Sequence, residues 1–179
     1  MTKRVHILGA SGSGTTTLGR ALAQELGAEH FDADDFFWTP TDPPYQLARP
    51  AAERIALLLS RLPSADGWVF SGSAMGWAKP LEALYDLIVY LRVAAPLRLD
   101  RLKRREQERY GARIAAGGDL ADTHVAFMTW ATAYDTAGAE QRSRVAHEAW
   151  LSTQPAPVLR LDSAIAVDEL VTQTLVALR

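Results

Sequence analysis

Residues 9–16 read GASGSGTT, a run with three glycines, four hydroxyl side chains and no charged group. They follow the apolar run VHIL and open a stretch of helical period. Glycines let backbone amides turn inward and approach a phosphate, and a helix start adds free N–H groups and the positive end of a dipole. The spacing matches the phosphate-binding pattern G-x-x-x-x-G-K-[ST] at all positions but one. We therefore expect the phosphates of a nucleotide to bind at Gly9, Ala10, Ser11, Gly12, Ser13, Gly14, Thr15, Thr16 and Thr17.

The departure from the pattern is Thr15, which stands where lysine is expected. That lysine normally carries positive charge to the β- and γ-phosphates. The chain has only three lysines but sixteen arginines, so an arginine from elsewhere is the expected substitute. Thr16 supplies a hydroxyl for Mg²⁺. A Gly/Ser turn that binds nothing is the alternative, and it is disfavoured because a turn needs one or two glycines rather than three at this spacing.

Acidic residues follow the second apolar run, in the sequence HFDADDFFW. Ligands of parallel sheets bind beyond the carboxyl ends of the strands. We therefore expect Asp32 near Mg²⁺ and Asp34 accepting a hydrogen bond from the substrate hydroxyl. The alternative is that Asp34 or Asp35 caps the following segment. Trp38 is the expected wall of the substrate pocket.

Gly72 follows the third apolar run, WVF, in the sequence WVFSGS. A bare backbone there would let a ligand approach closely, so Gly72 is a candidate substrate contact. A simple turn explains the same glycine equally well.

Arginines recur at helical spacing in the segment ending RLKRREQERYG, at Arg98, Arg101, Arg105 and Arg109. Arg105 or Arg109 could stack on a nucleotide base, with Arg113 reaching a phosphate and Arg142 or Arg144 supplying charge at the γ-phosphate. A solvated helix face explains the stripe equally well. A nucleic-acid patch is disfavoured by the net charge of −2.

Five short apolar runs, each of strand length, alternate with longer stretches of helical period and must position these groups. The runs are 5–9, 28–31, 68–70, 87–91 and 158–161. Such alternation indicates an α/β domain with a parallel sheet buried on both faces. A helix is predicted after Pro50, with an inward face formed by Ile55, Leu58, Leu59 and Leu62. The Gly-rich stretch 110–122 lies between helical segments and is a candidate mobile lid.

The composition limits the classes of protein that remain. The length of 179 residues predicts one domain over 1–179. The chain has no cysteine, which excludes disulfides and thiolate metal sites. No apolar run is long enough to cross a membrane, and VHIL is too short for a signal sequence, so a cytoplasmic location without membrane partners is expected.

The motifs GASGSGTTTLG, F-D-x-D, WVFSGS and FMTWATAYD resemble the adenylate-kinase-related P-loop proteins known as topology-modulation proteins or small "AAA family" ATPases. The loop itself is similar to the GSGTT loop of archaeal-type cytidylate kinases, which implies that a working kinase can lack the lysine. The acidic pair is similar to that of shikimate and gluconate kinases, which places Asp32 on the metal side and Asp34 on the substrate side. The resemblance implies a three-layer P-loop NTPase fold like that of nucleoside-monophosphate kinases, with strand order 2-3-1-4-5 and a lid.

Two functional classes therefore remain in view. The first is a kinase that uses ATP and Mg²⁺ and transfers the γ-phosphoryl group to a nucleotide or an unidentified small-molecule acceptor. The second is a nucleotide-binding switch or slow ATPase, which the missing lysine favours. A nucleic-acid-associated ATPase has only the arginine stripe in its support. A GTPase of the Ras type is disfavoured because its guanine-reading motif needs asparagine, and this chain has none.

Overall fold

The computed structural model describes residues 3–62 and 67–179 and contains a five-stranded parallel sheet. Its order is β2-β5-β1-β6-β7, which is the predicted 2-3-1-4-5 when these five strands are counted along the chain. All four strand pairings are parallel, and the first strand lies at the centre. The α/β fold with a parallel sheet, which the alternation of apolar runs and helical stretches predicts, is thereby confirmed. The strands are β1 (Arg4–Gly9), β2 (Glu29–Asp32), β5 (Trp68–Ser71), β6 (Leu87–Arg92) and β7 (Val158–Asp162).

Two hydrophobic clusters cover the two faces of this sheet, because successive side chains of a strand point to opposite faces. Val5 and Ile7 pack into one cluster with Leu18 of α1 (Thr15–Leu26) and Leu170 of α8 (Val167–Ala177). Leu8 faces the other cluster. That cluster includes residues of α2 (Ala33–Phe37), α3 (Ala51–Arg61), α4 (Lys79–Glu82) and α7 (Arg144–Leu151). Residues 1–2 and 63–66 of the predicted single domain lie outside the described part.

The helix after Pro50 is present as α3, but one residue of its predicted inward face is wrong. Leu58 is fully buried, whereas Leu59 is 52% exposed. Side chains of neighbouring residues in a helix point in directions that differ by about 100°. Leu58 and Leu59 therefore cannot both point straight at the core. Leu62 packs against the core cluster as predicted, and Leu57 packs there in place of Leu59.

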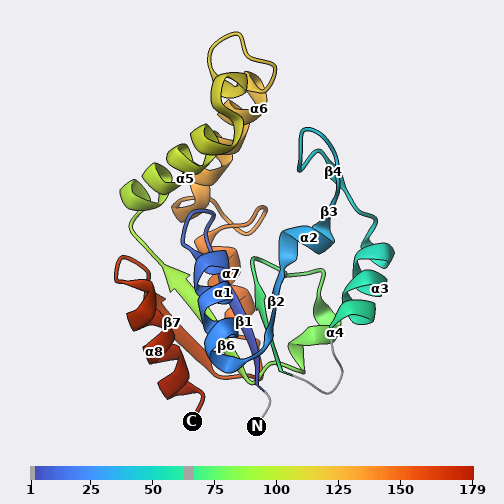
Figure 1. Cartoon of the computed structure of the whole chain (residues 1–179), viewed down its shortest axis with the longest axis vertical. Coiled ribbons are helices and arrows are strands. Elements are labelled where there is room, and N and C mark those ends of the chain that lie inside the picture. The colour runs from blue at the N-terminus through green and yellow to red at the C-terminus, as the bar shows by residue number, and fades with distance from the viewer. Residues whose placement is uncertain (1–2, 63–66) are drawn as a thin grey trace.

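Two projections flank the edge of the sheet where its strands end (Figure 1). One is an arm formed by α5 (Ala95–Tyr110), the 3₁₀ helix η1 (Gly111–Ile114) and α6 (Ala121–Thr132), which ends in η2 (Ala133–Asp135). The other is the small antiparallel hairpin of β3 (Trp38–Thr39) and β4 (Leu47–Ala48). The predicted lid, 110–122, forms the tip of the arm, and its mobility stays a prediction. No helix in the described ranges combines the length and apolar character of a membrane span.

Candidate nucleotide and acceptor site

The phosphate loop connects the end of β1 to the start of α1, in the strand-to-helix context that its sequence predicts. Gly12 and Gly14 have φ angles of +85° and +91°, which L side chains rarely adopt. A Cβ on Gly12 would come within 2.6 Å of the Arg98 carbonyl oxygen, whereas one on Gly14 would meet nothing within 4 Å. Gly14 is also the N-cap of α1, without a side chain to bond the first-turn amides. The loop is therefore packed against α5 on one side and open on the other, with free N–H groups for an anion.

Thr16 and Asp32 meet directly below this loop. Thr16 Oγ1 donates a hydrogen bond of 2.7 Å to Asp32 Oδ2, and Asp32 Oδ1 accepts one of 3.1 Å from the Asp34 amide. Asp32 is thus the N-cap of α2, so the alternative in which Asp34 or Asp35 caps this segment is wrong. The cap needs a residue in extended conformation just before the helix, and Asp32 is that residue.

The Thr16–Asp32 pair also fits the metal that a phosphate loop implies. Hydroxyl and carboxylate oxygens suit Mg²⁺, which is usually held by one or two carboxylates together with waters and substrate phosphates. No group of three or more His, Cys, Asp or Glu side chains that could hold a metal was found in residues 3–62 and 67–179. The donor set therefore fits Mg²⁺ bound together with a nucleotide, rather than a closed protein cage.

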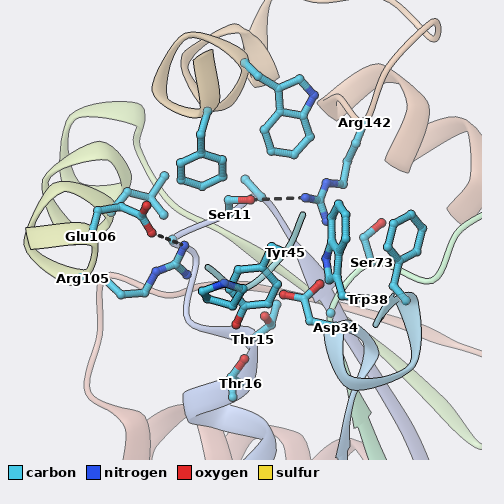
Figure 2. A pocket seen from close by; sticks show the side chains of 18 of the residues that line it. Ser11, Thr15, Thr16, Asp34, Trp38, Tyr45, Ser73, Arg105, Glu106 and Arg142 are labelled. Atoms are coloured by element: carbon cyan, nitrogen blue, oxygen red, sulfur yellow. Dashed lines mark hydrogen bonds and ion pairs between the residues drawn. The ribbon is translucent and has the colours of Figure 1, made fainter. Parts of the chain in front are cut away.

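Asp34 lies in the first turn of α2 and faces the cavity (Figure 2). Water reaches its carboxylate, yet the surrounding protein removes much of its hydration, and this desolvation raises its pKa above the ordinary value. The negative charge of Asp32 raises the pKa further, while Arg142, Arg105 and hydrogen bonding with the Trp38 side chain oppose the rise. The result is a carboxyl group that binds its proton more tightly than an ordinary aspartate.

Arg142 reaches the phosphate loop from the segment before α7 (Figure 2). Its Nη2 donates to Ser11 Oγ at 3.4 Å, and its guanidinium lies 4.6 Å from the ring centroid of Trp130 on α6. Burial lowers the pKa of Arg142, while the negative charge of Asp34 acts to raise it. An arginine stays protonated at neutral pH even so. The structure thus brings a cation to the loop that lacks its lysine.

The other predicted arginines divide between the cavity and its rim. Arg105 lines the cavity and pairs with Glu106 at 3.4 Å. Arg109 also lines it, with its guanidinium 5.2 Å from the Tyr45 ring centroid of the hairpin. Arg113 is instead held on the rim, where it pairs with Asp119 at 2.7 Å and with Asp42 at 3.5 Å. The structure does not bring Arg113 to the phosphate loop.

The first two arginines of the stripe, Arg98 and Arg101, make structural hydrogen bonds that hold the arm in place. Arg98 is 1% exposed, and it donates to the Ala131 carbonyl at 2.8 Å and pairs with Asp135 at 3.1 Å. Arg101 donates to the Ser163 carbonyl at 2.9 Å and also borders the cavity. The alternative of a wholly solvated helix face is therefore wrong, because α6 covers Arg98. Helical spacing alone could not reveal this, since it does not show which neighbouring helix packs on the stripe.

A cavity of about 1260 Å³ joins these groups, between the loop, the hairpin and the arm. Pockets that bind one drug-sized ligand have volumes of roughly 300–1,000 Å³, so this cavity is larger than a single ligand of that size requires. Trp38 and Gly72, the residues expected to contact the substrate, both border the cavity, and their role stays a prediction. Gly72 has a φ of +99°, and a Cβ there would meet Ala33 Cβ at 2.8 Å, so its backbone conformation and its packing on α2 both need glycine.

Several cavity residues were missed by the sequence reasoning. They are Tyr45, Ser73, Glu106, His124, Phe127 and Trp130. Tyr45 lies in a Pro-rich loop and Trp130 in the helical segment FMTW, so neither carries a local pattern that marks a site. The resemblance carried by FMTWATAYD was the one signal that touched Trp130.

Comparisons with known proteins place the fold of this chain and its family. No family model matches the chain. Among solved structures, it is similar to a shikimate kinase from Bacteroides thetaiotaomicron, with a TM-score of 0.60, 15% identity and 98% of both chains covered. It is also similar to a gluconokinase from Sinorhizobium meliloti 1021, with a TM-score of 0.55, 15% identity and coverage of 98% of this chain and 91% of that one. At these identities the likeness establishes the P-loop kinase fold.

Two curated proteins are similar in sequence. A stretch of 41 residues is 46% identical to shikimate kinase 2 of Sodalis glossinidius, over 23% of this chain and 24% of that one. The uncharacterized protein YqaC of Bacillus subtilis is 40% identical over 175 residues, which cover 98% of this chain and 97% of YqaC. The chain belongs to the family of YqaC, and its fold is that of the small-molecule kinases.

Proposed function

We propose that this protein is a kinase that transfers the γ-phosphoryl group of ATP to a hydroxyl or phosphate group of a small acceptor. The observation that carries the proposal is the placement of Arg142 against the phosphate loop, in the same cavity as Asp34. A transferase needs a phosphate cradle, a cation at the transferring group and an acceptor-orienting acid. The cavity contains a candidate for each.

The cation is the part that the sequence alone left open. The loop residue Thr15 cannot carry charge, and Arg142 supplies it from 131 residues away from Ser11, its contact in the loop. Trp130 holds the guanidinium plane by a cation–π contact, which fixes the charge without neutralising it. In the proposed reaction, Arg142 stabilises charge that develops on the γ-phosphoryl oxygens. Arg105, also on the cavity wall, adds to this field, and Arg109 contacts the nucleotide.

In the proposed reaction, Asp34 orients the acceptor. For a hydroxyl acceptor, its carboxylate accepts the hydroxyl proton while the acceptor oxygen bonds to the γ-phosphorus and the bond to the β–γ bridging oxygen breaks, which releases ADP. A pKa raised by burial brings the carboxyl group closer to the operating pH, which favours general-base action. Trp38 forms the adjoining wall, and Gly72 lets the acceptor approach the backbone.

Thr16 and Asp32 would hold Mg²⁺ beside the nucleotide phosphates. The ion would supply charge neutralisation on the β- and γ-phosphates. Arg113 joins the reaction only if the arm and the hairpin move, because its present partners are Asp119 and Asp42. We retain it as a lid arginine whose contact with a phosphate follows closure.

The test is ADP release from ATP and Mg²⁺ with a panel of acceptors, measured for the wild type and for Asp34→Asn. Gluconate and shikimate come first, because the similar structures are a gluconokinase and a shikimate kinase, followed by nucleoside monophosphates. We expect acceptor-dependent release that Asp34→Asn abolishes while ATP binding persists. Tight ATP binding without any phosphorylated acceptor would favour the alternative, a nucleotide switch or slow ATPase, which the missing loop lysine supports.

A further inference from the structure

A row of four hydrogen-bonded groups runs from the core to the cavity wall. The Tyr90 hydroxyl lies 2.8 Å from the Tyr134 hydroxyl, which lies 2.8 Å from His147 Nδ1. His147 Nε2 lies 3.0 Å from Ser73 Oγ, and Ser73 borders the cavity. The row joins β6, η2, α7 and the segment after β5, and the function proposed above does not use it.

His147 is neutral within this row. The side chain is fully buried, and burial lowers its pKa to about 3, with the positive charge of Arg142 acting in the same direction. A neutral imidazole has one N–H, so one ring nitrogen donates and the other accepts. The direction of the whole row therefore depends on which nitrogen holds the proton.

The need of the buried Tyr90 hydroxyl for a hydrogen-bond partner for its proton fixes that direction. Tyr90 is 1% exposed, and within the described part of the chain its hydroxyl has one hydrogen-bond partner, the Tyr134 hydroxyl. If the Tyr90 hydroxyl only accepted, its own proton would be buried without a partner, at a cost of about 1–3 kcal/mol. Tyr90 therefore donates to Tyr134, and Tyr134 donates to His147 Nδ1.

The proton of His147 then lies on Nε2 and is donated to Ser73 Oγ. Ser73 Oγ accepts within the row, so its own proton is free for a partner in the cavity. We propose that Ser73 is a specificity-determining residue, held by His147 as a hydrogen-bond donor to an oxygen atom of the acceptor. This rests on the proposed kinase function and narrows its substrate class.

The neighbouring groups define that class. Asp34, which accepts a hydrogen bond from the acceptor in the proposed reaction, also lines the cavity, and the close packing of Gly72 on Ala33 ties the segment of Ser73 to the start of α2. Asp34 as a hydrogen-bond acceptor and Ser73 as a hydrogen-bond donor suit a substrate with at least two oxygen functions. One is the hydroxyl that is phosphorylated, and the other is a second hydroxyl, a carbonyl or a carboxylate oxygen. Ser73 is not a nucleophile, because the neutral His147 donates to it and does not take its proton.

The first test is the tautomer of His147, read by ¹⁵N NMR of the full chain labelled in its histidines. The chain has four histidines, and His147→Gln identifies the signal that belongs to this one. We expect a protonated Nε2 and an unprotonated Nδ1. A proton on Nδ1 would reverse the row, make Ser73 the donor to His147 and overturn the proposal, whether or not the protein is a kinase.

The second test is kinetic and uses the acceptor phosphorylated fastest in the panel above. Ser73→Ala should raise the KM for that acceptor roughly three- to tenfold, the effect of one lost hydrogen bond, with the KM for ATP unchanged. Ser73→Thr keeps a hydroxyl and should restore most of the affinity. Ser152→Ala, a serine at the end of α7 that bonds the Ala149 carbonyl, is the matched control and should change neither constant.

The outcomes separate the two proposals. An unchanged acceptor KM in Ser73→Ala, with a phosphorylated acceptor in hand, removes the role of Ser73 and leaves the kinase. Failure of the whole panel removes the kinase, and the NMR result then decides by itself whether Ser73 faces the cavity as a donor. A loss of thermal stability in Ser73→Ala without any change in KM shows that Ser73 only satisfies His147.

Discussion

The guanidinium Nη2 of Arg142 lies 3.4 Å from Ser11 Oγ, although the two residues are 131 positions apart in the chain. The contact brings positive charge to a loop whose own sequence has none. It also gives the missing lysine a structural explanation, because the charge comes from across the cavity.

Loss of Arg142 should therefore affect catalysis more than binding. We expect Arg142→Ala to lower single-turnover phosphoryl transfer at least about a hundredfold, as loss of a transition-state donor does, with ATP affinity kept within about tenfold. Arg144→Ala is the matched control, since Arg144 is exposed and bonds the Asp135 carbonyl at 3.5 Å. Equal turnover in both variants would remove Arg142 from the mechanism.

The same idea predicts a rescue. Thr15→Lys places a lysine at the position that the phosphate-binding pattern reserves for it, so the double variant Thr15→Lys/Arg142→Ala should recover part of the turnover that Arg142→Ala loses. Thr15→Lys alone should bind ATP as the wild type does. Single-turnover rates of the wild type, the two single variants and the double variant measure the coupling between positions 15 and 142. If the effects of the two substitutions on the activation free energy simply added, the two side chains would serve different purposes.

The loop assignment is tested at Gly14. Gly14→Val should abolish ATP binding in calorimetry, because the side chain fills the open space before the first-turn amides and strains a φ of +91°. Gly27→Val is the control, since Gly27 also has a positive φ of +60° and nothing within 4 Å of its would-be Cβ, but it ends α1. Both variants should lose stability, and only the first should lose binding. Unchanged affinity in Gly14→Val would show that the loop is not the site.

The raised pKa of Asp34 predicts opposite effects on activity and stability. A raised folded-state pKa means that the folded protein binds more protons, so this group favours folding as pH falls and opposes it above its folded pKa. Asp34→Asn should therefore raise the midpoint of thermal unfolding at neutral pH and abolish transfer. In the wild type, the acid limb of the pH–rate profile should lie above the ordinary aspartate value. A less stable Asp34→Asn would show that the charge is favourable where it lies.

Two buried histidines predict acid destabilisation. Burial lowers the pKa of His6 to about 4 and that of His147 to about 3, from 6.5. A lowered folded-state pKa contributes stability above the unfolded value, and that stability is lost as pH falls from about 6.5 toward the folded value. Each histidine should cost about 2 kcal/mol between pH 7 and pH 5.

Urea unfolding at pH 7 and pH 5 measures this loss of stability, and the variant His6→Asn isolates the contribution of His6. Asparagine keeps an amide donor for the Phe70 carbonyl, which His6 Nδ1 contacts at 3.0 Å. The variant should lose less stability between pH 7 and pH 5 than the wild type does, by about 2 kcal/mol. An identical pH dependence in both proteins would mean that His6 is not the neutral buried group described above.

The sequence was informative where local pattern determines structure. The five apolar runs became the five strands, and the glycine spacing marked the turn between β1 and α1, because both depend on residues close together in the chain. It was silent where tertiary packing decides. Arg98 and Arg109 share one helical stripe, yet α6 covers Arg98 while Arg109 faces the cavity. Tyr45 enters the cavity on a hairpin whose position no local pattern encodes.

Trp130 has a consequence for how mutations on the arm will behave. Its ring belongs to α6, while the Arg142 guanidinium that it supports also contacts Ser11 of the phosphate loop. Within the arm, α6 is in turn fastened to α5 by Arg98, which donates to the carbonyl of Ala131, the next residue after Trp130. A substitution that tilts α6 therefore shifts the electric field at the loop without touching it. Surveys of random variants should place loss-of-function positions along the inner face of α6, far outside any motif that the sequence displays.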